Sequence, residues 1–515
     1  MKINQIKIGV VFSYLQMGLH IIVGLVYTPI MLRLMGQSEY GLYNTAASTI
    51  STLNILSLGF SSSYIKYYSH YKKRNETRNI HKLNGLYLLI FTFIGLIAAV
   101  CGIFLMFHLE LVFDKGFSTE EYKTARLLML LFTIDLSLSF PTSVFTSIIG
   151  AYEKFFFQKL MGMIQTVLTP CLTIPLLMLG YGSVGLVTVS LILSMVVWIV
   201  NIYYCVNKLN VKFVFCGLDW QLFKSLFTFS AFIAINMVVD QINWNIDKIL
   251  LGRYRGTAEV AVYAVGFSLY SYYQSFSTSI SNIFTPRIHK IVNDTNSDLE
   301  NQRYMLTELF TKVGRIQFLI LGLLSTGIIF FGKDFIEKIW TGHGYEDSYY
   351  VALLLIIPSS IALIQNLGIE VQRAQNRHQF RSIVYVSMAF INLVLSIFLC
   401  QLFGAIGSAV GTAISLVLAN GMIMNVFYYK RCYIDIPSFW RAIGRMGIGL
   451  IFPCIFGAVI NQLLPYSLWN FTIKIMLYSL AYIVSMWFIA LNEYEKNLVR
   501  SYCKRITSLL WRQKA

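Results

Sequence analysis

Residues 84–107 read NGLYLLIFTFIGLIAAVCGIFLMF, and residues 182–204 read GSVGLVTVSLILSMVVWIVNIYY. Neither stretch contains a charged residue, and each is long enough to cross the apolar core of a bilayer as an α-helix, which takes about 20 residues. The chain of 515 residues is 56% hydrophobic and 13% charged, whereas an average soluble domain is about 25% charged. The sequence therefore predicts an integral membrane protein whose outer surface is solvated by lipid.

Apolar segments of this kind recur along the whole chain and predict an all-α membrane protein with about fourteen transmembrane helices. Two of the segments, 40–65 and 222–247, are unusually polar, and the longest inner loop is expected at 286–315. The predicted spans are 8–32, 40–65, 84–107, 127–150, 160–179, 182–204, 222–247, 259–285, 316–332, 350–370, 382–402, 405–428, 444–462 and 471–491.

The distribution of basic residues predicts the topology. If the N-terminus lies inside, inner segments carry 31 of the 41 Lys and Arg residues, and outer segments carry 10. Basic residues concentrate on the cytoplasmic side of membrane proteins, so both termini are expected in the cytoplasm. The net charge of +17 is then a topology signal, and no nucleic-acid partner is expected because the basic residues alternate with apolar spans.

Two parts of the chain resemble each other at an offset near 220 residues. Residues 150–154 (GAYEK) precede Gly182-x-x-Gly185, and residues 373–377 (RAQNR) precede Gly404-x-x-Gly407. Each repeat unit holds six spans, an even number, so the two units share one orientation and are related by a pseudo-two-fold axis along the membrane normal. The predicted domains are a six-helix bundle at 1–215, a second at 216–430, and two additional helices with a basic tail at 431–515. Chance similarity between apolar segments is the alternative.

Four of the predicted spans carry polar residues at helical spacing, which places each set on one face. A polar face in the membrane needs protein or water beside it, because a charge at the bilayer centre costs about 2.5–3.5 kcal/mol. An offset of 216 aligns His20 with Asn236 and Gly24 with Asp240, in equivalent positions of the two halves. We expect a hydrated cavity between the halves, while packing between helices is the alternative for any single Ser or Thr. The candidate cavity residues are His20, Asn44, Asn54, Asn236, Asn243, Ser271, Ser275 and Asn282.

Three acidic residues are candidates for coupling to an ion. Asp240 lies well inside span 7 and is the first choice, and Asp135 lies about two turns into span 4. Asp247 is the third, next to Lys248 near the outer end of span 7, where the two residues could also pair or snorkel. For Asp240 the alternative is a hydrogen-bonded or neutral structural acid. The eight cysteines form no C-x-x-C or Cys/His cluster, so the sequence suggests no metal site, disulfide framework or cofactor.

The chain resembles the polysaccharide exporters of the multidrug/oligosaccharidyl-lipid/polysaccharide superfamily, including the O-antigen flippases. The motifs that carry the resemblance are residues 28–36 with 40–43 (YGLY), and residues 247–252 (DKILLG) followed by Val262-Tyr263. The resemblance implies a fold like that of the MATE transporters, with two six-helix bundles, often with two added helices. It also implies alternating access, with coupling to H⁺ or Na⁺ suggested for some members.

The resemblance also implies a cargo, an undecaprenyl-pyrophosphate-linked oligosaccharide such as an O-antigen or capsule repeat unit. The expected location is the bacterial cytoplasmic (inner) membrane, with membrane lipid and other polysaccharide assembly proteins as further partners. The family's cavities tend to be cationic, whereas the polar faces here are mainly Ser, Thr and Asn. The candidates for attracting the pyrophosphate are Arg33, Lys66, Lys248 and Arg287.

Two other functions remain open on the sequence. A drug/cation antiporter of the same superfamily would use acidic residues inside the cavity, such as Asp240 and Asp135. A membrane polymerase or ligase would usually present a large outer loop with reactive groups. No predicted outer loop exceeds about twenty residues, so a transporter is favoured over an enzyme.

Overall fold

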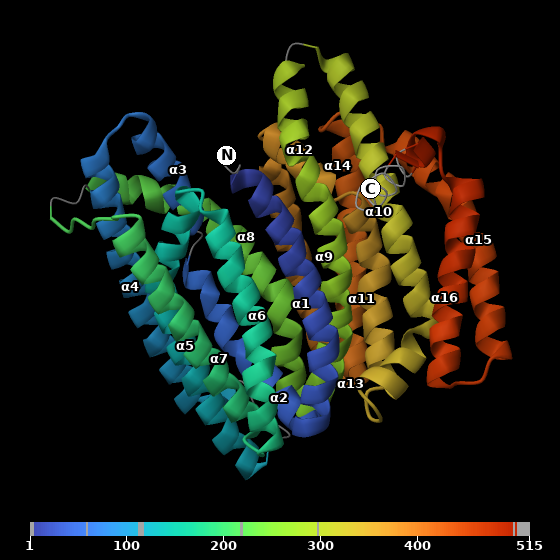
Figure 1. Ribbon diagram of the computed structural model, residues 1–515, viewed down its shortest axis with the longest axis horizontal. Helices are drawn as coiled ribbons and strands as arrows, with labels where there is room; N and C mark the ends of the chain where they lie inside the picture. Colours follow the sequence, from blue (N-terminus) through green and yellow to red (C-terminus); the bar gives the residue numbers. More distant parts are fainter. Residues whose placement is uncertain are drawn as a thin grey trace, which may run out of the picture. The chain divides into compact units, whose positions relative to one another are not determined.

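The computed structural model describes residues 5–57, 60–111, 118–216, 220–295, 298–497 and 500–501. These residues form helices joined by short turns and contain no β-strand (Figure 1). They divide into two compact units. The first unit comprises Met1–Leu269, Glu337–Leu355 and Ser382–Ser415, and the second comprises Tyr270–Ile336, Ile356–Arg381 and Leu416–Ala515. The sequence-based division at 215/216 and 430/431 follows the repeat rather than compactness, and it stays a prediction.

The first unit contains most of the N-terminal helices. Its helices are α1 (Gln5–Met35), α2 (Gln37–Ser51), α3 (Phe60–Lys73), α4 (Thr77–Phe107), α5 (Thr119–Ala151), α6 (Phe155–Met178), α7 (Gly182–Tyr203), α8 (Trp220–Tyr254), the start of α9 (Thr257–Asp294), the start of α11 (Asp347–Ile364) and most of α13 (His378–Leu416). The second unit holds the rest of α9, α10 (Leu299–Asp334), α12 (Leu367–Ala374), α14 (Met424–Lys430), α15 (Ile436–Leu463) and α16 (Leu468–Ser485).

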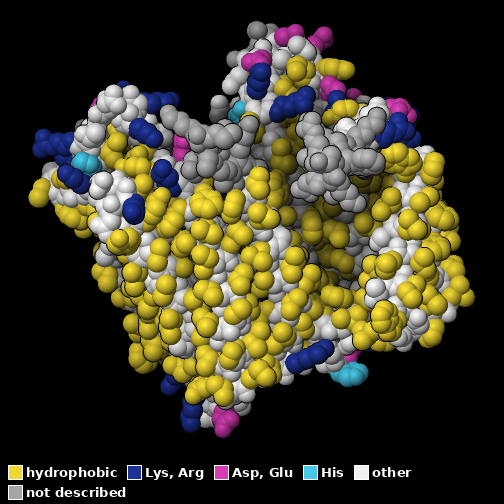
Figure 2. All heavy atoms as spheres, in the orientation of Figure 1, with side chains coloured by type: hydrophobic (Ala, Val, Ile, Leu, Met, Phe, Trp, Pro, Cys, Tyr) yellow, Lys and Arg dark blue, Asp and Glu magenta, His cyan; other side chains and the backbone are white. Residues whose placement is uncertain are grey.

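The surface of these helices is apolar over long stretches. Phe93, Leu96 and Val100 on α4 are 65%, 62% and 68% exposed, and Figure 2 shows hydrophobic side chains covering the first-unit helices between ends where charged side chains gather. Among the described residues, ten segments are long and apolar enough to cross a membrane. Large exposed apolar surface of this kind is stable only against lipid, so the predicted class, an all-α multi-span membrane protein, is confirmed.

One of these ten segments, Gln379–Lys430, holds two predicted spans. Gly404 within α13 has φ 59° and ψ −135°, a conformation that requires glycine. Across it, Thr412 Oγ1 lies 3.3 Å from Asn392 Oδ1, although twenty residues of straight helix would separate them by about 30 Å. The chain therefore reverses at Gly404, as the predicted spans 382–402 and 405–428 require. Three predicted spans are not among the ten segments: 40–65, which is divided between shorter helices, 222–247 within α8, and 259–285 within α9.

The prediction of one continuous helix over 40–65 is wrong. Helix α2 ends at Ser51, a 3-10 segment spans Thr52–Ser57, and α3 begins at Phe60. Side chains here bond to carbonyls three residues earlier: Ser51 Oγ donates to Ser48 O at 2.9 Å, and Thr52 Oγ1 donates to Thr49 O at 2.7 Å. Such bonds compete with the helical ladder, which explains why a Ser- and Thr-rich span breaks where an apolar one would continue.

The predicted inner segment at 286–315 is helical over most of its described length. Helix α9 continues to Asp294, and α10 begins at Leu299, with Asp298 Oδ1 accepting from Asn301 N at 3.0 Å as an N-cap. The two helices have 38 and 36 residues, so each is about 55 Å long. This exceeds the roughly 30 Å apolar core of a bilayer, so the turn between them projects beyond it. Charged residues in this segment made it resemble a loop although they lie on helical surfaces.

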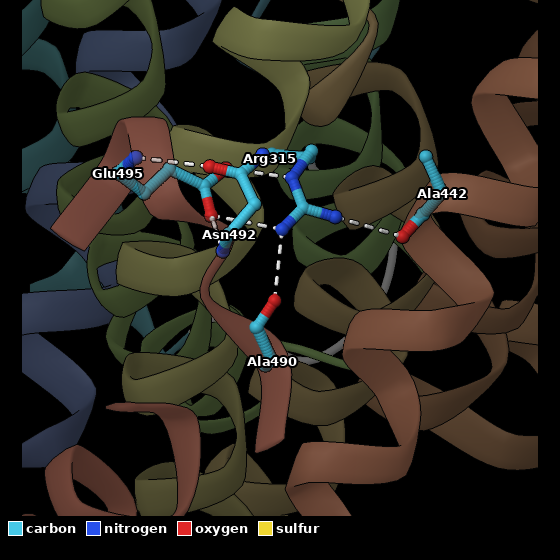
Figure 3. A network of polar contacts seen from close by, with 5 residues as sticks. All are labelled: Arg315, Ala442, Ala490, Asn492 and Glu495. Carbon is cyan, nitrogen blue, oxygen red and sulfur yellow. Dashed lines mark hydrogen bonds and ion pairs between the residues drawn. The ribbon is translucent and has the colours of Figure 1, made fainter. Parts of the chain in front are cut away.

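A buried ion pair ties the C-terminal helices to α10 (Figure 3). Arg315 on α10 donates to Glu495 through Nε at 2.6 Å and NH2 at 2.8 Å, and it also donates to the carbonyls of Ala442 and Ala490. Asn492 Oδ1 in turn accepts from Glu495 N at 2.9 Å. Arg315 and Glu495 are only 9% and 8% exposed. The pair fixes the segment after α16 against α10 and α15, next to the apolar core of Met446, Tyr482 and Met486.

We expect replacement of Glu495 by Ala to leave Arg315 buried without its charge partner, and to destabilise the second unit by about 3–5 kcal/mol. Thermal unfolding of the purified protein in detergent measures this. Replacement of Glu308 by Ala is the matched control, because its ion pair with Lys312 on the same helix is exposed and worth less than about 1 kcal/mol. Equal melting temperatures of the two variants would contradict the role of the buried pair.

We expect Gly404→Ala to destabilise the first unit by about 1–3 kcal/mol, because its positive φ is strained for any residue with a Cβ. A Cβ at this position would also lie 2.6 Å from Glu259 Oε2. Gly327→Ala in α10 is the control, since a Cβ there meets no atom within 4 Å and alanine favours helix. Chemical or thermal unfolding should separate the two variants, and a neutral Gly404→Ala would argue against a constrained turn.

Candidate functional site

A buried carboxylate, Asp247, lies among hydroxyl and amide groups within the first unit. Tyr263 OH donates to Asp247 Oδ2 at 2.7 Å, and Thr412 Oγ1 donates to the same oxygen at 2.9 Å. Thr412 Oγ1 lies 3.3 Å from Asn392 Oδ1, which accepts from Ser396 Oγ at 3.2 Å. We call these five residues the Asp247 cluster. They come from α8, α9 and the two arms of α13.

The Asp247 cluster is able to hold a proton or a small cation. Asp247 is 1% exposed, and its Oδ1 has no hydrogen-bond partner among the described residues. The neighbouring Lys248 directs its Nζ over the ring of Phe267, 4.7 Å from the centroid. Carboxylate, amide and hydroxyl oxygens are the ligands that hard cations prefer. A buried carboxylate with a spare oxygen is costly in a membrane unless it binds a positive charge.

Two turns of the chain assemble the cluster. The reversal at Gly404 brings Asn392 on the first arm of α13 against Thr412 on the second, and the turn at Gly256 brings Tyr263 beside Asp247. Sequence reasoning named Asp247 but missed its partners on α13. The signal was available, because Asn392 and Ser396 are four residues apart in a largely apolar span and therefore share one face.

The two repeats carry matching contacts at the end of the first unit where the α1–α2 and α8–α9 turns lie. Glu39 Oε1 accepts from Ser183 N at 2.6 Å, and Glu259 Oε2 accepts from Ala405 N at 2.8 Å. Each accepting carboxylate lies in the first turn of its helix. Each donor follows a glycine with positive φ, which is 53° at Gly182 and 59° at Gly404.

The spacing of these pairs shows that the two repeats align here at an offset of 220 residues. Glu39 and Glu259 are 220 residues apart, as are the turn glycines Gly36 and Gly256, which have φ 78° and 91°. The alignment at 216 is therefore wrong here by four residues, about one helical turn. A slip of one turn keeps every polar residue on the same face, so periodicity alone does not detect it. At 220, His20 aligns with Asp240, and Tyr27 aligns with Asp247.

Several contacts join the halves of the chain at this same end of the first unit. Ser38 Oγ lies 2.8 Å from Thr257 Oγ1, and a Cβ on Gly41 would lie 1.8 Å from Thr257 O, so α2 and α9 approach closely. Arg33 NH2 donates to Ile339 O at 3.2 Å, and Trp340 Nε1 donates to Leu25 O at 3.0 Å. The end predicted to face outward is thus closed by polar contacts within this unit.

The predicted cavity residues have varied surroundings. His20 and Asn282 are exposed, whereas Asn44, Asn54, Asn243, Ser271 and Ser275 are half-buried. Asn44 and Asn54 donate to Tyr40 O and Ser51 O, and Ser275 Oγ donates to Ser271 O. Each of these bonds is local, to a carbonyl three or four residues earlier, and holds the polar group in place. The side chains of Asn236 and Asp240 lie outside the described residues.

The predicted phosphate-attracting residues do not form one group within the described contacts. Lys66 and Arg287 are exposed on α3 and α9, and Arg33 is exposed at the opposite end of α1 from the N-terminus. Lys248 faces Phe267. Asp135 on α5 is half-buried, and its Oδ1 has no hydrogen-bond partner among the described atoms. Asp135 is therefore a second acidic position inside the helices, apart from the Asp247 cluster.

One protein family and several solved structures are similar to this chain. A family model described as "Polysaccharide biosynthesis protein" matches residues 9–292. No curated protein matches the chain.

Solved structures with the same fold include a lipid II flippase, MurJ, in an inward closed conformation. It is 18% identical over 92% of this chain and 97% of its own, with a TM-score of 0.65. The MATE multidrug transporter DinF-BH is 15% identical over 83% of this chain and 96% of its own, with a TM-score of 0.58. The Vibrio cholerae MATE transporter VcmN is 13% identical over 85% and 98%, with a TM-score of 0.54. The predicted MATE-like fold is thus confirmed.

We expect the Asp247→Asn variant to lose a cation- or proton-dependent stabilisation of the folded protein. A ligand that binds only the folded state at 100 times its Kd adds about 2.7 kcal/mol. Melting temperature is measured in NaCl and in choline chloride, at two pH values. Asp347→Asn is the control, because Asp347 is exposed in the first turn of α11. If all three proteins respond equally to Na⁺ and to pH, the Asp247 cluster binds neither ion.

Proposed function

This chain belongs to the polysaccharide biosynthesis protein family, and we propose that it is a flippase for a lipid-linked oligosaccharide. The proposed cargo is an undecaprenyl-pyrophosphate-linked O-antigen or capsule repeat unit, and the proposed location is the bacterial cytoplasmic membrane with both termini in the cytoplasm. The family description supports a role in polysaccharide assembly. The fold shared with a flippase for lipid II, which is itself a lipid-linked saccharide, supports the class of cargo.

The observation that carries the proposal is the Asp247 cluster. Carboxylates buried among membrane helices are rare and often belong to an ion or substrate pathway. Here the carboxylate lies where α8, α9 and both arms of α13 meet. Neutralising Asp247 with H⁺ or Na⁺ would change the stability of that packing. The cluster thereby links ion binding to the arrangement of these helices.

In this proposal the lipid tail stays in the bilayer while the saccharide crosses along the polar faces of α1, α2, α8 and α9. Amide and hydroxyl groups along those faces suit sugar hydroxyls, because both can donate and accept hydrogen bonds. Lys66 and Arg287, both exposed, are the candidates for drawing the pyrophosphate in from the cytoplasm. The contacts near the α1–α2 turn then separate when the transporter opens outward.

A multidrug/cation antiporter is the second candidate. The observation that favours it is the pair of acids inside the helices, Asp135 on α5 and Asp247 on α8, each with a carboxylate oxygen that lacks a partner among the described atoms. An antiporter of this fold would exchange a proton or Na⁺ for a cationic drug at such positions. The family description names polysaccharide biosynthesis, so we place this function second.

The test is a deletion strain complemented with wild type, Asp247→Asn or Asp347→Asn. Lipid-linked oligosaccharide and surface polysaccharide are quantified together, with protein level checked in membranes. We expect the deletion and Asp247→Asn to reduce surface polymer about tenfold or more and to accumulate the intermediate in the inner leaflet. The Asp347→Asn control should restore both quantities, because its carboxylate is exposed.

Two contrary results would change this proposal in different ways. Unchanged surface polysaccharide in the deletion strain, with greater sensitivity to cationic drugs, would overturn the flippase and favour the antiporter. Polymer restored fully by Asp247→Asn would keep the flippase and remove the Asp247 cluster from its mechanism. Mass spectrometry of the accumulated lipid would identify the saccharide.

A further inference from the structure

A polar pocket of about 260 Å³ lies within the second unit, where α9 ends and α10 begins. It is formed by the end of α9, the first turn of α10, the turn after α12, and the loop that follows α14. The polar residues that line it are Asn293, Gln302, Gln375, Asn376, Arg377 and Tyr433. No acidic side chain is among the lining residues in the described chain. The pocket is separate from the Asp247 cluster, which lies in the first unit.

Arg377 supplies a positive charge with unused hydrogen-bonding capacity. Its guanidinium lies 5.0 Å from the ring centroid of Tyr433. Its NH1 is buried and has no hydrogen-bond partner among the described residues. The backbone fixes this position, because Arg377 N donates to Gln372 O at 2.8 Å after Asn376 takes φ 55°. A buried guanidinium nitrogen without a partner is costly, and it points to an anion in the pocket.

Amide groups beside the arginine are also held in place. Gln375 Nε2 donates to Gln302 Oε1 at 3.2 Å and to Cys432 O at 3.3 Å. Gln302 Nε2 in turn donates to Val292 O at 3.4 Å. Gln375 Oε1 is buried and has no hydrogen-bond partner in the described part of the chain. An acceptor of this kind is suited to a hydroxyl group, which can donate to it.

The first half of the chain has the same turn with different chemistry. Glu153 N donates to Gly150 O and Lys154 N to Ile149 O, as Asn376 N does to Arg373 O and Arg377 N to Gln372 O, each pair 223 residues apart. Glu153 has φ 59°, close to the 55° of Asn376. In the first copy an acidic residue precedes the basic one in sequence, and in the second copy a neutral amide precedes Arg377. Because no acidic residue precedes Arg377 in the second turn, a ligand can supply the anion there.

We propose that this pocket binds a phosphate ester that carries neighbouring hydroxyl groups. The planar guanidinium matches phosphate oxygens through paired hydrogen bonds. Gln375 Oε1 supplies an acceptor and the exposed Asn376 amide supplies donors and an acceptor for the hydroxyls, while the Tyr433 ring lies 5.0 Å from the guanidinium. An anionic glycerophospholipid head group and a soluble sugar phosphate share this chemistry. The pocket does not depend on the proposed transport, because it is formed within one unit.

Binding is measured on the full-length protein in nanodiscs of phosphatidylcholine, which carries no net charge. Glycerol 3-phosphate, followed by equilibrium dialysis, represents the soluble source. Phosphatidylglycerol added to the nanodiscs, followed by native mass spectrometry of retained lipid, represents the membrane source. Arg377→Gln should weaken binding of the recognised probe about tenfold or more, as expected for hydrogen bonds to a charged group.

Arg373→Gln is the matched control. It removes the same charge from the same turn, but its side chain is exposed and pairs with Glu370 at 2.6 Å, outside the pocket lining. A second variant, Asn376→Glu, recreates the carboxylate of the first half at a φ that Glu153 already adopts, so the turn should fold while anion binding is lost.

Retention of phosphatidylglycerol without binding of glycerol 3-phosphate would show that the pocket takes a lipid head group. Binding of glycerol 3-phosphate alone would show that it takes a soluble phosphate ester. Failure of the wild type to bind either probe would overturn the proposal. Equal losses in Arg377→Gln and Arg373→Gln would also overturn it, because they would show a general charge effect.

Discussion

Lipid offers no hydrogen bonds, and the rest of this structure follows from that constraint. Backbone groups in the membrane must bond within their own segment, which leaves helices as the solution for this chain. Polar side chains meet the same demand. Ser and Thr bond to carbonyls of their own helix, Arg315 finds Glu495 and two carbonyls, and Asp247 finds Tyr263 and Thr412. Arg315 and Asp247 each join several helices, so their contacts fix helix packing.

The repeat provides a symmetric scaffold with asymmetric chemistry. Glu39 and Glu259 bond to equivalent backbone groups in the two halves, so this contact belongs to the scaffold. Other equivalent positions differ. Tyr27, which aligns with Asp247, shares a hydrogen bond with Thr173 and carries no carboxylate. Glu153 aligns with Asn376 at matching turns. The second half thus holds the buried Asp247 and also Arg377, whose NH1 lacks a hydrogen-bond partner among the described residues.

Two π-helical segments lie near positions where the chain passes between its two compact units, and two others, Tyr204–Lys208 and Met486–Ala490, lie inside a unit. A π-helical segment spans Phe335–Trp340, across the boundary at Ile336, and another spans Val417–Ile423, just after the boundary at Ser415. π-helical turns are rare within α-helices and are frequent at functional sites. The second of them directly follows the arm of α13 that carries Thr412. Thr412 therefore lies within two turns of an irregular helical segment.

The sequence by itself determined the membrane class, most helix positions, the reversal near Gly404 and the existence of a repeat. These depend on hydropathy and on glycine, which are properties of single residues and short segments. It did not determine the break in α2–α3, the helical extension through 286–315, the one-turn register of the repeat, or the partners of Asp247 and Arg315. Only the tertiary structure decided these, because Asp247 and Thr412 are 165 positions apart, and Arg315 and Glu495 are 180 apart. Periodicity fixes the face on which a polar residue lies, whereas its partner depends on which helices pack against that face.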